Sequence, residues 1–465
     1  MPTTRRPAGR ATSAAALAAC AALVLAACSG GDDDADGGIT VWIQEDLPDR
    51  VAATQEIVDG FTSASGIAVE LVPVGEDQFN QLLISAAAAG DLPDVIGGVS
   101  LPQVRTLSAN ELLDVDAVAE VVQTLGEDTF TGRALELTRD GDAQLAVPSE
   151  SWLQLLYYRT DLFEAAGLDP PTSYDAILAA AEELDTEDLA GFVGATAPGD
   201  AFTEQTFEHV ALGNGCELVD EGGEVTLDSP ACVEALDFYG TLVQEHSVPG
   251  AQDVDTVRAS YFAGQAAMFI WSTFVLDEMA GLRNDAMPSC DECAENPAFL
   301  AENTGVVTAI DGPSGGEPAQ FGEVTSWTVV GESDRDGAVA FVEHMMTDGY
   351  LDWIAIAPEG KVPVRVGTAE NPTEFTDAWA ELPVGVDTKA PLADFYAPEV
   401  LEALRAGPEG LSRWALEQGQ GDLLGATQGE QPVATAVNEV SSGSEARSTA
   451  ETAAEAVRSI QESVS

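Results

Sequence analysis

ITVWI at residues 39–43, GIAVELV at 66–72 and DVI at 94–96 are three short apolar segments with the length and composition of strands. Between the first two, residues 50–65 carry apolar side chains at helical spacing. Between the second and the third, residues 79–89 are rich in Ala and are followed by a glycine, which commonly ends a helix. This alternation of strand and helix predicts a parallel sheet of the α/β class.

The rest of the chain continues in the same manner. We expect strands at 157–167, 225–227, 306–310 and 324–330, and helices at 173–184, 231–245, 336–346 and 446–463. Ser173 has a side chain suited to capping the first of these helices. The roughly 425 residues that follow position 38 exceed one compact core, so we expect two lobes.

The amino terminus has the pattern of a lipoprotein signal. Arg5, Arg6 and Arg10 precede an apolar run that closes on LAAC at residues 25–28. We expect residues 1–27 to be removed and Cys28 to carry a diacylglycerol thioether, with a further acyl chain on the freed amine; two chains give stable anchoring. The alternative is an ordinary cleaved leader in which Cys28 has no role.

Residues 28–38 then form the lipidated Cys and an acidic, Gly-rich tether without apolar side chains. No later window contains about twenty apolar residues, so the expected membrane contact is through lipid alone. These features predict a protein held at the extracytoplasmic face of the cell membrane.

The charge is strongly one-sided. The chain has 80 acidic and 18 basic residues, a net charge of -62, and only two lysines, Lys361 and Lys389. Such a surface repels phosphate backbones, so nucleic acid is excluded as a partner. We interpret the acidity as adaptation to a salty or alkaline medium; compositional drift is the alternative.

Four cysteines remain after Cys20 is lost with the leader and Cys28 is lipidated. In an exported protein an even set favours disulfides, and the candidates are Cys216, Cys232, Cys290 and Cys293, with three connectivities open. Zinc needs four ligands, and none of the three His lies near either pair of cysteines in the sequence. We therefore expect no metal and no cofactor.

Several sequence blocks resemble one protein family. They are ITVW (39–42), Phe61 with Gly66-Ile67, AGDLPD (89–94), LAVP (145–148), YRTDLFEAAGL (158–168) with Pro171-Thr172, FAGQAAM (262–268) with Trp271, and GKVPVR (360–365). In this order they are similar to the solute-binding lipoproteins of bacterial ABC importers, in the carbohydrate-binding family 1 that includes maltose-binding protein. The resemblance extends from about residue 39 to the end of the chain.

The resemblance implies a periplasmic-binding-protein-like fold, with two α/β lobes joined by several hinge strands and a ligand cleft between them. Lobe 1 would comprise 39–149 and 306–345, and lobe 2 would comprise 150–305 and 350–465. It also implies a receptor, not an enzyme, that closes on a solute and delivers it to a membrane permease. We expect the receptor to be a monomer.

The candidate ligand-binding residues follow from these blocks, since sugars need flat apolar faces and paired polar groups. Trp152, with Glu150 beside it, lies at the expected hinge. Trp271, Ser272 and Phe274 follow the FAGQAAM block, Trp327 begins a returning strand, and Arg365 ends the last block. Glu45 and Asp46 lie at the carboxyl end of the first strand, where α/β sheets bind ligands.

Each of these residues also has an alternative structural role. The Trp side chains would be core, Arg365 would pair with a carboxylate, and Glu45 and Asp46 would lie in a solvated loop. The sequence has Gly97-Gly98 where maltose-binding protein has an aromatic and a carboxylate, which argues against a maltodextrin. We expect a sugar or oligosaccharide; the alternatives are a polyamine, a metal, a peptide or another small solute on the same fold, and a lipid-anchored glycosidase.

Overall fold

The computed structural model describes residues 38–316, 318–331 and 333–464, and residues 38–465 form one compact unit. The predicted signal peptide, Cys28 and the tether lie outside the described residues. None of the described helices combines the length and the apolarity that crossing a bilayer requires.

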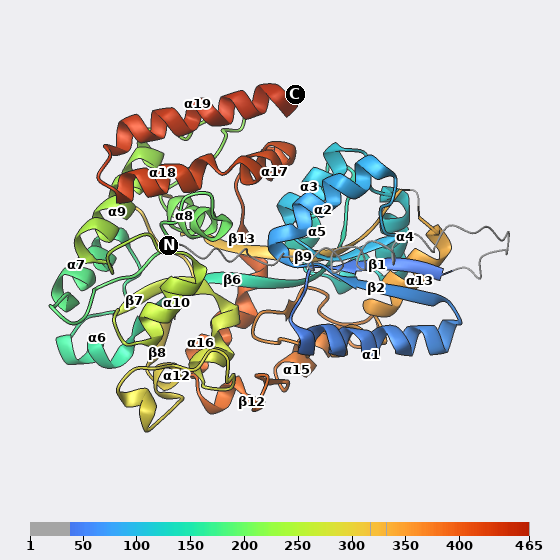
Figure 1. Cartoon of the computed structure of the whole chain (residues 1–465), viewed down its shortest axis with the longest axis horizontal. Helices are drawn as coiled ribbons and strands as arrows, with labels where there is room; N and C mark the ends of the chain where they lie inside the picture. The colour runs from blue at the N-terminus through green and yellow to red at the C-terminus, as the bar shows by residue number, and fades with distance from the viewer. Residues whose placement is uncertain (1–37, 317, 332, 465) are drawn as a thin grey trace, which may run out of the picture. The chain divides into compact units, whose positions relative to one another are not determined.

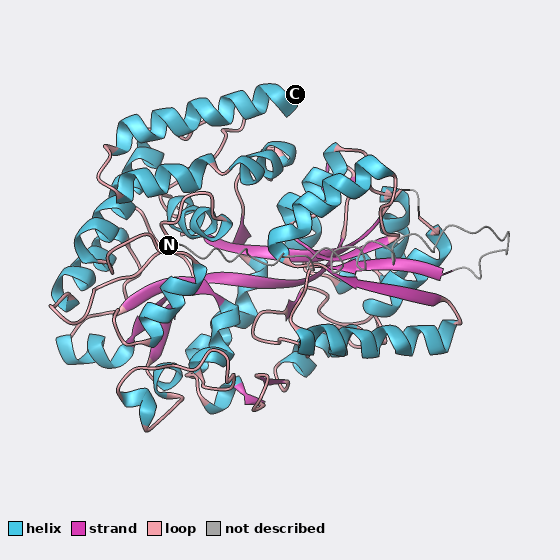
Figure 2. Ribbon diagram, viewed as in Figure 1, coloured by secondary structure: helices cyan, strands magenta, loops and turns pink. Residues whose placement is uncertain are grey.

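A mixed sheet runs through the described unit (Figures 1 and 2). Its strands are β1 (Gly38–Ile43), β2 (Ala68–Pro73), β3 (Val95–Val99), β6 (Val147–Arg159), β7 (Met268–Ser272), β8 (Thr304–Val307), β9 (Gln320–Val329), β10 (Val362–Pro363) and β13 (Leu411–Ser412). The order is β10-β6-β9-β3-β1-β2, with β13 beside β9 and with β7 and β8 beside β6. Two separate two-stranded sheets are formed by β4 (Arg139–Asp140) with β5 (Ala143–Gln144), and by β11 (Pro383–Val384) with β12 (Ala390–Pro391).

Helices cover this sheet on both faces (Figure 2). In the first part of the chain they are α1 (Pro48–Ser65), α2 (Glu76–Ala89), α3 (Leu101–Ala109), α4 (Val115–Leu125), α5 (Gly132–Leu137), α6 (Thr160–Ala166), α7 (Tyr174–Leu184), α8 (Ala201–Leu212) and α9 (Pro230–His246). They continue as α10 (Val254–Phe262), α11 (Leu276–Met279), α12 (Phe299–Glu302), α13 (Arg335–Met345), α14 (Tyr350–Ile354), α15 (Glu374–Trp379), α16 (Pro398–Ala406), α17 (Gly421–Glu430), α18 (Pro432–Ser441) and α19 (Ala446–Val464).

The predicted alternation at the amino end is confirmed. β1 pairs in parallel with β2 and with β3, and α1 and α2 lie between these strands in the chain. Both helices end at a glycine in the left-handed conformation, with φ of 79° at Gly66 and 67° at Gly90. The predicted cap of α7 is also confirmed, because the Ser173 side chain accepts a hydrogen bond from the backbone N–H of Ala176.

The thirteen residues of β6 connect two parts of the sheet. Its first half pairs with β9, from Val147 opposite Trp327 to Leu153 opposite Gly322. Its second half pairs with β7 and β8, from Gln154 opposite Ser272 to Arg159 opposite Thr304. β9 in turn pairs with β3, so β6 and β9 together link the strands at the amino end of the chain to those in its middle.

Some predicted elements are wrong. The strand expected at 157–167 ends at Arg159, and α6 occupies 160–166. The strand expected at 225–227 is reduced to a single bridge between Val219 and Val225. The strand expected at 306–310 is β8, which begins two residues earlier and ends at Val307.

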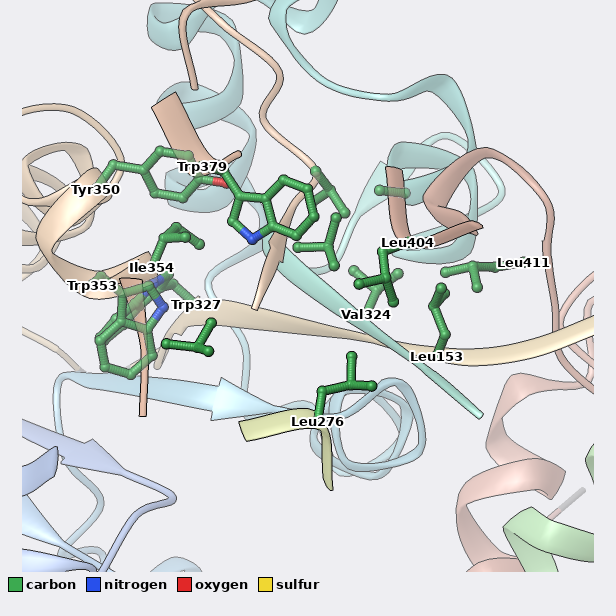
Figure 3. Packing of buried hydrophobic residues seen from close by; sticks show 14 of the residues in the cluster. Leu153, Leu276, Val324, Trp327, Tyr350, Trp353, Ile354, Trp379, Leu404 and Leu411 are labelled. Carbon is green, nitrogen blue, oxygen red and sulfur yellow. The ribbon is translucent and has the colours of Figure 1, made fainter. Parts of the chain in front are cut away.

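The buried core follows the sheet. One apolar cluster spans β1, β3, β6, β7 and β9 together with the helices beside them. Figure 3 shows part of it, with Trp327 next to Trp353 and Ile354, and with Leu153 near Val324. A second cluster lies among α7, α8, α9, α18 and α19.

The structure joins the four cysteines as Cys216–Cys232 and Cys290–Cys293. The first disulfide ties the segment after α8 to the first turn of α9, and the second closes a short loop before α12. The disulfide prediction is confirmed, and of the three open connectivities this is the one present.

Candidate functional site

Trp152 lies at the junction of β6, β7 and β9. It is half-buried and stands opposite Glu323 of β9, and its ring centroid is 6.0 Å from that of Phe321. Two residues further along β6, Gln154 pairs with Ser272 of β7. The strand pairing therefore places Trp152 and Ser272, both predicted ligand residues, on neighbouring positions.

Phe274 is the second residue after β7 and is also half-buried. The guanidinium carbon of Arg50 lies 5.5 Å from its ring centroid, within cation–π range. Gly360 makes room for the ring, because a Cβ at that position would lie 2.1 Å from the nearest Phe274 atom. Phe274 thus packs against α1 on one side and the loop before β10 on the other.

The loop after β1 reaches the same place. The Glu45 carboxylate lies 3.3 Å from the Arg50 guanidinium and accepts hydrogen bonds from the backbone N–H groups of Asp46 and Leu47. Arg50 therefore connects Glu45 to Phe274. Asp46 is exposed and lies beside Gly75, where an added Cβ would be 2.9 Å from its Oδ2.

Trp271 has a different environment. Its side chain is buried, its Nε1 donates to the carbonyl of Val254 at 3.1 Å, and its ring packs 5.7 Å from that of Phe202. It supports the segment that carries Ser272 and Phe274 but offers no free face.

Trp327, another of the predicted ligand residues, has a fully buried side chain, which fits the alternative core role. Its ring lies 5.1 Å from Trp353 and 5.9 Å from Phe341 (Figure 3). The reason is on the neighbouring strand: Gly97 pairs with Trp327, and a Cβ there would lie 2.1 Å from the indole. The glycine at 97 makes room for this ring.

Glu150 and Arg365 are also core residues. Glu150 is 2% exposed and accepts hydrogen bonds from Trp353 Nε1 at 2.9 Å and from Lys361 Nζ at 2.8 Å. Arg365 donates to the Met346 carbonyl and to Thr129 Oγ1, and burial lowers the pKa of its guanidinium. Arg365 therefore has a structural role, but its hydrogen-bond acceptors are a carbonyl and a hydroxyl, not the carboxylate that the sequence alternative named.

An ionic network beneath Trp152 was not predicted. Arg413 Nε donates to Glu208 of α8 at 3.1 Å, and its NH1 donates to Glu323 of β9. Glu323 also accepts the backbone N–H of Leu101 at the start of α3, at 2.8 Å. The guanidinium carbon lies 4.6 Å from the Phe321 ring centroid, so the network and Trp152 contact the same phenyl ring.

Unpartnered polar atoms gather beside this network. Among the described residues, Gln154 Oε1, Thr203 Oγ1, Glu204 Oε2 and Gln320 Nε2 are buried and have no hydrogen-bond partner. Gln154 Nε2 donates to Thr206 of α8 at 3.2 Å, which places α8 against β6 next to Trp152. Burial raises the pKa of Glu204 to about 8, and repulsion from Glu208 adds to this.

This arrangement can bind a polar solute. An aromatic face lies beside buried donors and acceptors that lack partners, and an unpaired buried polar group costs about 1–3 kcal/mol until it finds one. Hydroxyl groups, which both donate and accept, would satisfy such atoms. We therefore define the candidate site as Trp152, Ser272, Phe274, Arg50 and Glu204.

A groove of about 660 Å³ lies elsewhere, along the edge strand β10. It is lined by residues that include Thr131, Val362, Thr376, Trp379 and Arg405. No predicted ligand residue lines it, so it is separate from the candidate site.

Comparison with known proteins identifies the family of this chain. A family model described as bacterial extracellular solute-binding protein matches residues 44–351. The Escherichia coli K12 protein YcjN, whose name describes it as an ABC transporter periplasmic-binding protein, is 29% identical over 351 residues, which are 72% of this chain and 76% of YcjN.

Solved structures with the same fold include two sugar complexes. The GacH receptor of Streptomyces glaucescens, solved unliganded and with acarbose, has a TM-score of 0.69 at 19% identity and covers 92% of this chain and 99% of its own. A sugar transporter protein of Arthrobacter chlorophenolicus with bound laminaribiose has a TM-score of 0.67 at 18% identity, covering 91% and 99%.

The predicted fold class, periplasmic-binding-protein-like, and the resemblance drawn from the sequence blocks are both confirmed. The chain belongs to the bacterial extracellular solute-binding proteins, the maltose-binding-protein-like family 1 of ABC transporter components.

Proposed function

We propose that this protein is the receptor of an ABC importer for a neutral sugar or oligosaccharide, which it captures outside the membrane and passes to the permease without altering it. The observation that carries the proposal is the half-buried Trp152 beside Gln154 Oε1 and Glu204 Oε2, two buried oxygens that have no hydrogen-bond partner. Pyranose rings offer an apolar face for an indole and hydroxyls for the polar atoms. The sugars bound by two structures of the same fold, acarbose and laminaribiose, lend this choice support.

In this proposal the chain has two lobes that move about β6 and β9. Strand pairing supports a change to the lobe boundaries expected from the sequence. β8 pairs with the second half of β6, so we assign β8 to lobe 2. The second segment of lobe 1 would then begin at about residue 320 instead of at 306. α14 packs against α1, which supports extending that segment past 345 to about 365. Lobe 1 would then hold β1, β2 and β3, and lobe 2 would hold β7 and β8.

In this proposal α3 belongs to lobe 1 and α17 to lobe 2, and contacts between the two helices would hold the lobes closed. The two helices pack closely, and an added Cβ at Gly425 would lie 2.8 Å from the Pro102 carbonyl oxygen. Because only a solute that fits both lobes stabilises the closed arrangement, the permease would receive the closed form.

The amino-terminal pattern completes the proposal. Lipidation of Cys28 and the acidic tether at 29–38 would hold a monomeric receptor near the extracytoplasmic membrane surface, within reach of its permease. The acidic composition would keep it soluble where salt screens its self-repulsion.

A thermal-shift screen of the protein tests the class of solute. We expect at least one neutral mono- or oligosaccharide to raise the melting temperature further as its concentration increases, because a solute that binds only the folded state stabilises it. Spermidine, short peptides and divalent metals serve as the comparison.

A shift with spermidine and none with any carbohydrate would replace the sugar with a polyamine. Release of nitrophenol from nitrophenyl glycosides would instead identify an enzyme. Either result would overturn the proposed function.

A further inference from the structure

Two carboxylates near Phe274 are buried, and each has one oxygen without a hydrogen-bond partner. Asp277 of α11 and Glu359, in the loop before β10, are each 1% exposed. Among the described residues, Asp277 Oδ1 and Glu359 Oε2 have no hydrogen-bond donor. Burying an unpaired ionised carboxylate costs so much that such a group usually takes up a proton instead.

Three segments of the chain meet around these two side chains. Phe274, three residues before Asp277, packs on Gly360, the residue after Glu359. Arg50 of α1 lies over Phe274 and interacts electrostatically with both carboxylates. In the proposed function α1 belongs to lobe 1 and α11 to lobe 2, so this cluster forms where the lobes touch.

The cations around the cluster are already engaged. Arg50 pairs with Glu45 at 3.3 Å. Arg258 contacts Asp255 at 2.8 Å and Glu278 at 3.1 Å. Arg283 contacts Asp285 at 2.8 Å and Glu278 at 3.4 Å. Three guanidinium groups thus face six carboxylates, and the two without an ion pair are Asp277 and Glu359.

The electrostatic balance at these two groups favours protonation. Burial, followed by repulsion from Glu359 and Glu278, raises the pKa of Asp277, while Arg283 and Arg50 oppose the change. Burial also raises the pKa of Glu359, and Arg50 and Arg283 oppose it there. The remaining neighbour is the phenol of Tyr396, which donates to the Leu276 carbonyl at 2.6 Å and is itself neutral.

We infer that Asp277 and Glu359 form a proton-binding site that is complete only in the closed arrangement of the lobes. When the lobes separate, both carboxylates meet water and ionise; when they close, the pair takes one proton from solvent. The proton returns to solvent on opening, and no covalent bond other than O–H changes. The link to closing rests on the proposed function.

The sign of the pH effect follows from this exchange. The folded, closed state binds more protons than the unfolded or open state, so its stability is fully present below the ordinary carboxyl pKa of about 4 and is lost as the pH rises through the raised values. Solute affinity should therefore increase as the pH falls from about 9 to about 5.

Urea unfolding of the whole chain from about pH 5 to about pH 9, with a sugar from the screen present at a saturating concentration so that the lobes are closed, tests the site itself. The wild type should lose stability as the pH rises, and Asp277→Asn and Glu359→Gln should each lose less. Asp352→Asn is the control, because Asp352 is an exposed carboxylate on α14 near Glu359. Glu204 and Glu217, whose pKa values are also raised, contribute equally in all four proteins. If the pH slopes of Asp277→Asn and Glu359→Gln equal that of the wild type, the site does not exist.

Calorimetric titration of a sugar from the screen, in phosphate and in Tris buffer at one pH, tests the coupling to closing. Phosphate and Tris have different ionisation enthalpies, so the apparent binding enthalpies of the wild type in the two buffers should differ in proportion to the number of protons taken up. Asp277→Asn should remove most of that difference. Tight binding with no proton uptake by the wild type would overturn the inference and leave the receptor function intact. If no sugar binds to the wild type, the proposed function fails, and the inferred coupling of proton uptake to closing fails with it.

Discussion

Replacing Arg413 with methionine is expected to destabilise the protein by about 3–5 kcal/mol. Arg413 is 3% exposed and holds Glu208 and Glu323, each 1% exposed. Removing the guanidinium would leave two buried carboxylates without their cation, and the attraction that now offsets their desolvation would be lost. Burial already raises the pKa of Glu323 against the opposing effect of Arg413.

Urea unfolding at neutral pH measures this loss, and Arg458→Met is the matched control. Arg458 makes one ion pair, with Asp228, and its side chain is 43% exposed, so its loss should cost below about 1 kcal/mol. If Arg413→Met and Arg458→Met destabilise the protein equally, Arg413 does not stabilise the junction of α8, β9 and α3.

Replacing Trp327 with alanine is also expected to destabilise the protein, again by about 3–5 kcal/mol. The indole is fully buried against Trp353 and Phe341 and fills the space that Gly97 leaves on β3. The surrounding strands cannot close that space, so a cavity would remain and the lost contacts would not be recovered.

Trp152→Ala provides the comparison. Because Trp152 is only half-buried, its replacement should lower the free energy of unfolding clearly less in the same experiment. The opposite ranking would contradict the placement of these two side chains. Equal stability of Trp327→Ala and the wild type, together with weakened sugar binding, would restore the ligand-facing role that the sequence had suggested for Trp327.

The elements at the amino end could be predicted because their patterns are local. β1, β2 and β3 are short apolar segments, α1 and α2 are each followed by a glycine, and the helix of 173–184 has its own cap at Ser173. The wrong prediction of a strand at 157–167 has a physical reason. The apolar residues that continue after Arg159 fit a strand or a short helix equally well, and the packing of α6 that decides between them depends on distant segments.

The candidate site was predicted only in part. Trp152, Ser272 and Phe274 stood in recognisable sequence blocks, and the structure brings them near one another. Arg413, Asp277 and Glu359 stood in none. With 80 acidic residues in the chain, nothing local distinguishes a buried carboxylate from a solvated one, since burial arises from contacts between segments far apart in sequence. The scarcity of basic residues was the one usable signal, because it marks each Arg as a probable ion-pair partner of buried acids.

Calorimetric titration of the best sugar from the thermal-shift screen into the wild type, Trp152→Ala and Tyr158→Leu tests the central claim most directly. Tyr158 is a half-buried aromatic on the same strand, six residues further along and in contact with Phe163 instead of the site. We expect Trp152→Ala to weaken binding at least about tenfold, roughly 1.4 kcal/mol, and Tyr158→Leu to bind as the wild type does. Unchanged affinity of Trp152→Ala, or the absence of binding by any carbohydrate, would contradict the central claim.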